Sequence, residues 1–184
     1  MLHALDFETE AIDNRPHYPP KPVGLAHFDG TDSIYLAWGH PCQNNCTEAN
    51  AIEYLLNLFE SEIDEFIYHN TAFDCSIIEE RWHIEVPWGR VHDTMLQAFL
   101  LDPYGELSLK PLADKYLGMA PVEQDAVRDW LIHHGVVRAN SKDWGAFIAK
   151  APGDIVGRYA IGDVVRTYHL FHLFHQRLAG KGMQ

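Results

Sequence analysis

MLHALDFETE, residues 1–10, begins with the mostly apolar segment from Leu2 to Leu5 and continues with Asp6 and Glu8 on either side of Phe7. A short apolar run of this kind predicts a β-strand. Residues two apart in a strand point to the same side of the sheet, so the carboxylates of Asp6 and Glu8 should lie next to each other. Neighbouring anions repel, and this strand end therefore requires something that offsets their charge.

The length and composition of the chain predict one globular domain over residues 1–184. Of the 184 residues, 47% are hydrophobic and 12% aromatic, which is enough for one well-packed core and short for two. The N-terminus has no basic segment followed by an apolar run, and no stretch approaches the roughly 18 apolar residues of a membrane span. Three cysteines are a low and odd number for a disulfide framework. We therefore expect a non-secreted, cytoplasmic protein with reduced thiols and no membrane partner.

The net charge of −12 argues against nucleic acid as a partner, because Lys and Arg drive phosphate binding. The acidic excess is uneven, however: residues 1–92 hold 4 Lys and Arg against 16 Asp and Glu, whereas residues 93–184 hold 10 of each kind. Most of these acids are expected to form a solvated surface, and a minority are candidate metal ligands.

Periodicity divides the chain into a strand-rich first half and a helical second half. Five strands are predicted at residues 3–8, 22–30, 32–39, 65–70 and 88–93, the first three as an antiparallel meander. Helices are predicted at residues 47–59, 71–82, 94–101, 108–117, 123–134, 142–150 and from Pro152, in the first turn, to about residue 178. Such an order of strands and helices indicates an α/β or α+β layered domain with a mixed sheet.

Two further pairs of polar residues are spaced for one face of a helix. Asn70 and Asp74 are four residues apart after the predicted fourth strand, and Tyr159 and Asp163 have the same spacing among apolar residues of the last helix. Ligands bind at the carboxyl end of strands in α/β sheets, and a carboxylate in an apolar helix is costly unless it is paired. Each pair alone also has a structural explanation, with Asn70 as a helix cap and Asp74 as a solvated acid.

Three motifs occur in order: Asp-x-Glu in the first strand, Asn-x-x-Phe-Asp after the fourth and Tyr-x-x-x-Asp in the last helix. From residue 6 to residue 163 this order resembles the DEDD exonucleases of the tyrosine subclass, which include the proofreading domains of family-A DNA polymerases and RNase D. Residues 92–118 are similar to the polymerase-type members. The histidine subclass is excluded, because its histidine would fall at Arg158. The resemblance implies an RNase H-like α/β fold with a mixed five-stranded sheet flanked by helices.

The resemblance also implies a site with two divalent cations, Mg²⁺ or Mn²⁺. Two such cations can activate water, screen the phosphate and stabilise the leaving 3′ oxyanion, and hard oxygen ligands suit both metals. Asp6 would bridge the cations, and Asp74 would hold the second one. Glu8 and Asp163 would complete the first site. Tyr159, as a phenol with a reference pKa of about 10, is a poor base at neutral pH and is expected to orient the attacking water.

Four more residues are implied as substrate contacts. Asn70 would contact the terminal nucleotide or the scissile phosphate, and Phe73 would pack near a base or sugar. The backbone at Phe7 and Thr9 would position the 3′ end. Five basic residues near the last motif are candidates for contacts with phosphates, and about half of them are expected to be solvated charge instead: Arg138, Lys142, Lys150, Arg158 and Arg166.

The predicted reaction is hydrolysis of single-stranded DNA 3′ ends to nucleoside monophosphates, in proofreading for a DNA polymerase of a bacterial or phage-infected cell. Two alternatives stay open. One is an RNase D-like exoribonuclease; the other is a catalytically silent nucleic-acid-binding or polymerase-docking module, whose expected loss of an acidic residue is not seen. Residues 181–183, Lys-Gly-Met, look like the point at which phage-type polymerases continue, so a polymerase could be attached in cis or act in trans.

Overall fold

The computed structural model describes residues 1–182. Met183 and Gln184 lie outside the described residues, and with them the last two positions of the predicted domain and the last position of the Lys-Gly-Met segment. The strands are β1 (Leu2–Thr9), β2 (Pro22–Phe28), β3 (Ser33–Ala37), β4 (Glu65–Tyr68) and β5 (Val91–Asp93). The α-helices are α1 (Glu48–Phe59), α2 (Thr71–Ser76), α3 (Thr94–Leu101), α4 (Leu109–Leu117), α5 (Glu123–His133) and α6 (Gly153–Gly180). Shorter helical turns are η1 (Ile77–Arg81), η2 (Trp88–Arg90) and η3 (Trp144–Lys150). Within residues 1–182, no helix has the length and apolar character needed to cross a membrane.

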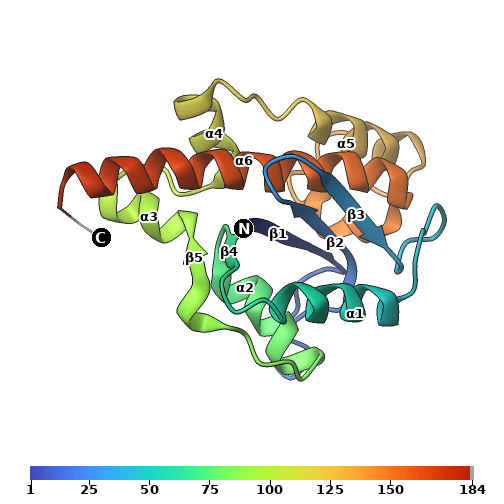
Figure 1. Cartoon of the computed structure of the whole chain (residues 1–184). Coiled ribbons are helices and arrows are strands. Elements are labelled where there is room, and N and C mark those ends of the chain that lie inside the picture. The colour runs from blue at the N-terminus through green and yellow to red at the C-terminus, as the bar shows by residue number, and fades with distance from the viewer. Residues whose placement is uncertain (183–184) are drawn as a thin grey trace.

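The five strands form one mixed sheet in the order β3-β2-β1-β4-β5 (Figure 1). β1 pairs antiparallel with β2 and parallel with β4, while β2 and β3 are antiparallel and β4 and β5 parallel. The predicted mixed sheet is therefore confirmed, with the first strand at its centre. β4 pairs with Leu2 to Ala4, and β2 pairs along the strand through Asp6 and Glu8, so the acidic pair stands on a strand that is held at its base from both sides.

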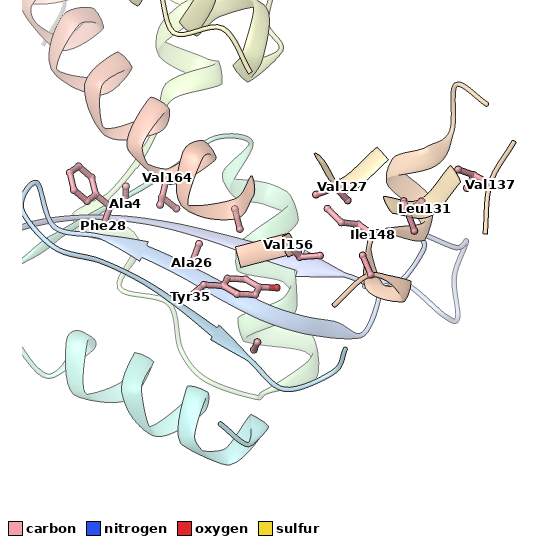
Figure 2. Close-up of a cluster of buried hydrophobic side chains, with 13 residues drawn as sticks. Ala4, Ala26, Phe28, Tyr35, Val127, Leu131, Val137, Ile148, Val156 and Val164 are labelled. Atoms are coloured by element: carbon pink, nitrogen blue, oxygen red, sulfur yellow. The ribbon is translucent and has the colours of Figure 1, made fainter. Parts of the chain in front are cut away.

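The alternation of side chains along β1 directs the acidic pair toward α6. Ala4 packs with Val164 of α6 in the cluster between that helix and the sheet (Figure 2). Leu5 belongs to a second cluster on the opposite face, which α1 and α2 cover. Because alternate residues of a strand share a face, Asp6 and Glu8 lie on the side of Ala4 and of α6.

Helix α6 approaches the sheet closely because small residues lie along its buried side. A Cβ atom at Gly157 would stand 2.9 Å from Cδ1 of Tyr35 on β3, which is closer than side chains tolerate. The helix is tied down at its start by the Gly153 N–H, which donates to the carbonyl of Cys42 at 3.0 Å. Ala160 is fully buried against the sheet. The packing of α6 therefore fixes the distance between its polar motif and β1.

The predicted fifth strand is shorter than expected. Its first three residues form the 3₁₀ turn η2, in which the Arg90 N–H donates to the carbonyl of Pro87 at 2.8 Å. An amide used inside a turn cannot join the sheet ladder. Pairing with β4 therefore starts only at Val91.

The helical predictions also need three corrections. Residues 142–150 were expected to form an α-helix, but the structure has the 3₁₀ helix η3 there; Gly145 weakens a helix and the nearby Pro152 cannot donate a backbone hydrogen bond. Pro152 is the N-cap of α6 and not part of its first turn. The helix predicted over residues 71–82 is α-helical only in α2 and continues as the π-helix η1, after which the Trp82 ring packs against Phe7 with centroids 5.1 Å apart.

Candidate active site

Three carboxylates meet where β1 faces α6. Asp6 and Glu8 extend from β1 and Asp163 from α6, and one oxygen of each lies within 4.8 Å of the others. Glu8 and Asp163 are buried, and Asp6 is partly buried. Over the described range, residues 1–182, this is the one group of three or more Asp, Glu, His or Cys side chains placed to hold a metal ion. The residues predicted for the first metal site are thus neighbours in space.

Asp74 approaches the same strand from α2. Its side chain is 2% exposed, and its Oδ1 accepts a hydrogen bond from the Phe7 N–H at 2.9 Å. Asp74 lies outside the group of three. Burial raises the pKa of Asp74 well above its usual range, and the negative charge of the nearby Asp6 raises it further. Because the Phe7 N–H is bonded to Asp74, it is not free to hold a 3′ end.

Asp93, which was not among the predicted site residues, shapes the start of α2. Its carboxylate accepts the N–H groups of Asn70 and Thr71 at 3.1 and 3.0 Å, and its Oδ1 also accepts the Met95 N–H at 2.8 Å. Asn70 has a left-handed backbone with φ of 71° and makes no capping bond through its side chain. Asp93 therefore accepts the amides at the start of α2, and the alternative role of Asn70 as a helix cap does not apply, because its side chain is exposed and makes no capping bond. An Asp directly before a predicted helix is the signal that could have found it.

Burial and mutual repulsion raise the pKa of the carboxyl groups of this site. Burial raises the pKa of Asp6 to about 8, with a further increase from Asp163 and an opposing effect of Lys110. Burial, with the charges of Asp6 and Asp163, raises the pKa of Glu8 well above its usual range. Burial raises the pKa of Asp163 against the lowering effects of Lys110 and Arg166. Groups crowded in this way are held in their ionised form only by cations, and an all-oxygen donor set fits Mg²⁺ or Mn²⁺.

Lys110 on α4 is a further member of the site that was not predicted from the sequence. Its Nζ donates to the hydroxyl oxygen of Tyr159 at 2.8 Å and to Oδ2 of Asp163 at 2.7 Å. Tyr159 and Asp163 do share one face of α6, as their spacing predicted. Burial, together with the charges of the nearby carboxylates, raises the pKa of the Tyr159 phenol well above its usual range. No local pattern distinguishes Lys110 from the exposed Lys115 on the same helix, so its role could not be predicted.

Arg166 holds the other side of the Asp163 carboxylate. Its side chain is 4% exposed, and its Nη1 pairs with Glu123 and lies 3.4 Å from Oδ1 of Asp163. Its guanidinium also donates to the carbonyls of Met119 and Ala120. The expectation that Arg166 contacts phosphates is therefore wrong, because its donors are used inside the protein. The other four basic candidates are at least partly exposed.

A pocket of about 310 Å³ lies beside Glu8 and is lined by three of the predicted substrate contacts. Phe7 and Thr9 form one wall, Phe73 of α2 another, and residues of η3, including Ile148, a third. Helix η3 also places the Trp144 ring edge-on to Tyr159, with centroids 6.2 Å apart. Asn70, the fourth predicted contact, is not part of the lining.

A mixed sheet with acidic residues on its central strand, crossed by a helix that carries Tyr and Asp four residues apart, is an RNase H-like fold, and together with the family match it defines an exonuclease of the DEDD superfamily. The family model described as 3′-5′ exonuclease, from family-A DNA polymerases, matches residues 3–179. The chain belongs to this 3′-5′ exonuclease family. The fold class and the enzyme class expected from the sequence are thereby confirmed, and divalent metal ions are the cofactors of this superfamily.

Two DNA polymerases are similar to the chain in sequence. The DNA polymerase of Escherichia phage T5 is 28% identical over 180 residues, which cover 93% of this chain and 19% of the polymerase. DNA polymerase I of Borreliella burgdorferi is 25% identical over 176 residues, which cover 95% of this chain and 17% of the polymerase. The chain thus spans about a fifth of the length of these relatives.

Two solved structures share the fold at lower sequence identity. Brucella melitensis NrnC is 19% identical with a TM-score of 0.64, over 100% of this chain and 76% of that one. Escherichia coli RNase D, described as an exoribonuclease involved in structured RNA processing, is 17% identical with a TM-score of 0.60, over 98% of this chain and 40% of that one. These likenesses concern the fold.

Proposed function

We propose that this exonuclease removes nucleotides from the 3′ ends of single-stranded DNA, releases nucleoside monophosphates and proofreads for a DNA polymerase. The observation that carries the proposal is the convergence of Asp6, Glu8 and Asp163 within 4.8 Å beside a pocket large enough for a nucleotide base and sugar. All four acids of the superfamily pattern are present, which disfavours a catalytically silent module.

The carboxylates are proposed to hold two divalent cations, Mg²⁺ or Mn²⁺. Asp6, Glu8 and Asp163 would hold one cation, and Asp6 and Asp74 would hold the other. Cations bound there would supply activation of water and stabilisation of the leaving 3′ oxyanion. Tyr159 is assigned to orienting the attacking water, since a phenol with a raised pKa keeps its proton and acts through hydrogen bonds.

The terminal nucleotide is proposed to occupy the pocket beside Glu8. Phe73 offers an aromatic face for a base or sugar, and the Thr9 backbone lies at the end of β1, where the ladder shifts between Glu8 and Thr9. Asn70, exposed ahead of α2, is assigned to a contact with the terminal nucleotide or the scissile phosphate. This arrangement accepts a single-stranded end and leaves the scissile phosphate at the carboxylates.

Similarity to two DNA polymerases favours DNA as the substrate and a polymerase as the partner, in cis or in trans. We propose that residues 1–184 act as one exonuclease domain in either arrangement. RNA is the second candidate substrate, because the chain shares its fold with RNase D, an exoribonuclease.

Digestion of 5′-labelled single-stranded DNA and RNA of one sequence, with Mg²⁺, Mn²⁺ or EDTA, tests this function. The wild type should shorten DNA stepwise from its 3′ end and faster than RNA. EDTA, Asp6→Ala or Asp163→Ala should each slow the reaction by roughly 10³-fold or more, because several kcal/mol of transition-state stabilisation is lost. Glu62→Ala, at an exposed acid, is the matched control and should keep the rate. A ladder of shortened products that survives EDTA would contradict the metal-dependent reaction. If RNA is shortened as fast as DNA or faster, RNA replaces DNA as the proposed substrate.

A further inference from the structure

Lys110 is the one lysine that the structure places between Tyr159 and Asp163, two residues assigned to different tasks. The same Nζ atom donates to both of them, at 2.8 and 2.7 Å, and lies 4.3 Å from the centre of the Tyr159 ring. Lys110 belongs to α4, whereas Tyr159 and Asp163 belong to α6. A single flexible side chain from another helix therefore links the proposed water-orienting hydroxyl to a proposed metal ligand.

The chemistry of the ammonium group fixes the direction of these hydrogen bonds. An ammonium has three hydrogens to donate and accepts none. The Tyr159 oxygen therefore accepts from Lys110, and the hydrogen of the hydroxyl must point away from Lys110. The contact thus sets both the position of the Tyr159 oxygen and the side from which it can donate.

The two cations on Asp163 differ in how easily they can leave. Arg166 is 4% exposed and is held by Glu123 and two carbonyl groups, whereas the Lys110 side chain is 21% exposed and its bonds go to Tyr159 and Asp163. Lysine is a compact charge on a flexible stem, and it can move without breaking a buried network. Lys110 is therefore the cation that can give way at Oδ2 of Asp163.

We propose that Lys110 is a positioning residue of the exonuclease: it orients Tyr159 for the reaction and occupies Oδ2 of Asp163 in competition with a divalent cation. The inference rests on the proposed function. It predicts opposite effects on two measurements when the charge is removed, because Lys110 repels the metal but supports the catalytic arrangement of Tyr159. A residue that only supports the fold would weaken both.

The test compares Lys110→Met, which keeps a side chain of similar length but removes its charge, with Lys115→Met, the same change at an exposed lysine on α4. Calorimetric titration with Mn²⁺ should show binding to Lys110→Met tighter by roughly 3- to 10-fold, because a like charge beside the ligand is gone. The kcat on single-stranded DNA should fall by roughly 10- to 100-fold, the cost of a misplaced group, with KM changed less than about twofold. Lys115→Met should match the wild type in all three quantities.

Two further variants separate positioning from structural support. In a Tyr159→Phe background, Lys110→Met should lower kcat much less than in the wild type, because the two changes remove the same interaction between Lys110 and the Tyr159 hydroxyl. Lys110→Arg should recover part of kcat, and its Mn²⁺ affinity should be close to that of the wild type. If circular dichroism shows that Lys110→Met is unfolded, Lys110→Arg takes its place in the comparison.

Three results would overturn the inference: weaker Mn²⁺ binding in folded Lys110→Met, a raised KM at constant kcat, or equal losses in both Tyr159 backgrounds. If only Lys110→Arg can be compared, a loss of kcat that is equal in both Tyr159 backgrounds would do the same. If the wild type cleaves neither DNA nor RNA, the proposed function fails, while the Mn²⁺ titration still tests the competition at Asp163.

Discussion

At the scale of single residues, the acidic pair on β1 is tolerated because other groups surround it with compensating charge. Asp6 and Glu8 meet Asp163, and Lys110 and Arg166 take up part of the resulting negative charge. Burial is the largest cause of the raised pKa of Asp6 and Glu8, and the remaining repulsion between the carboxylates raises it further. A site of this kind binds protons when cations are absent, and it exchanges those protons for metal.

The pH dependence of stability follows from the raised pKa of Asp6. Its pKa is about 8 in the folded protein, against an ordinary value of 3.8, so between these pH values the folded state holds a proton that the unfolded state has lost. Stability from this group is complete below the lower value and is lost as the pH rises toward 8. In EDTA, the free energy of unfolding should therefore contain a contribution that falls with pH by up to about 1.4 kcal/mol per unit.

Urea unfolding of the wild type and of Asp6→Asn in EDTA, at three values between about pH 5.5 and 7.5, isolates this contribution. The variant should lose less stability over the series, and the stabilisation of the wild type by Mg²⁺ should grow with pH. Asp32→Asn, at an exposed acid, serves as the control. Parallel pH profiles for the wild type and Asp6→Asn would show that Asp6 keeps an ordinary pKa.

The acidic residues of the site could be found from the sequence, whereas the cations that balance them could not. Asp6, Asp74 and Asp163 lie in three short motifs that strand and helix periods place on one face each, and the joint order of these motifs, which resembles the DEDD exonucleases, assigned them to one site. Lys110 reaches Asp163 from a helix 53 residues away in the chain, and no local period reports such a contact. Arg166 lies three residues from Asp163 on the same helix, but its partner Glu123, which holds its guanidinium there, is 43 residues away.

At the scale of elements, α6 connects the sheet to the rest of the molecule. It packs on β1, β2 and β3 and also contacts α3, α4 and α5 (Figure 1). Arg166 fixes one of these contacts by joining α6 to Glu123 at the start of α5 and to the two carbonyls before it. The carboxylate of Asp163 is therefore held by the same side chain that holds two helices together.

Removal of the Arg166 charge should destabilise the protein strongly. Arg166→Met leaves Glu123 without its partner and the buried Asp163 with one cation fewer, and breaking a buried pair in this way costs about 3–5 kcal/mol. Arg158→Met is the matched control, since its contact with Asp154 is exposed at 4.0 Å, and such pairs are worth about 0–1 kcal/mol. Urea denaturation of both variants measures the difference. Equal losses of stability would mean that the Arg166 network does not join α5 to α6.

The elements themselves were predictable to different degrees. The strands and the long helices follow strong periodicity, and α3 begins and ends at its predicted residues. The short segments at η2 and η3 were misjudged because they close through hydrogen bonds between residues three apart, such as the Arg90 N–H to the Pro87 carbonyl and the Ala146 N–H to the Asp143 carbonyl. Periodicity cannot separate a 3₁₀ helix from one turn of an α-helix or a short strand over so few residues.

At the scale of the whole molecule, the fold brings together residues from both ends of the chain. β1 supplies Asp6 and Glu8, α2 supplies Asp74 and α6 supplies Asp163. The site therefore has all of its carboxylates only when α6 is packed on the sheet. Part of the acidic excess of residues 1–92 lies in this site. Divalent cations held there would offset the charge of the carboxylates, so a net charge of −12 does not prevent a nucleic acid from approaching the site.

Anomalous diffraction from crystals grown with Mn²⁺ tests whether these carboxylates form a divalent-cation site. Two peaks are expected. One should lie about 2.0–2.6 Å from oxygens of Asp6, Glu8 and Asp163, the range for hard cations, and the other between Asp6 and Asp74. Crystals of Asp163→Asn should weaken the first peak. Full occupancy of Mn²⁺ elsewhere, with no peak at the three carboxylates, would show that Asp6, Glu8 and Asp163 do not form this site.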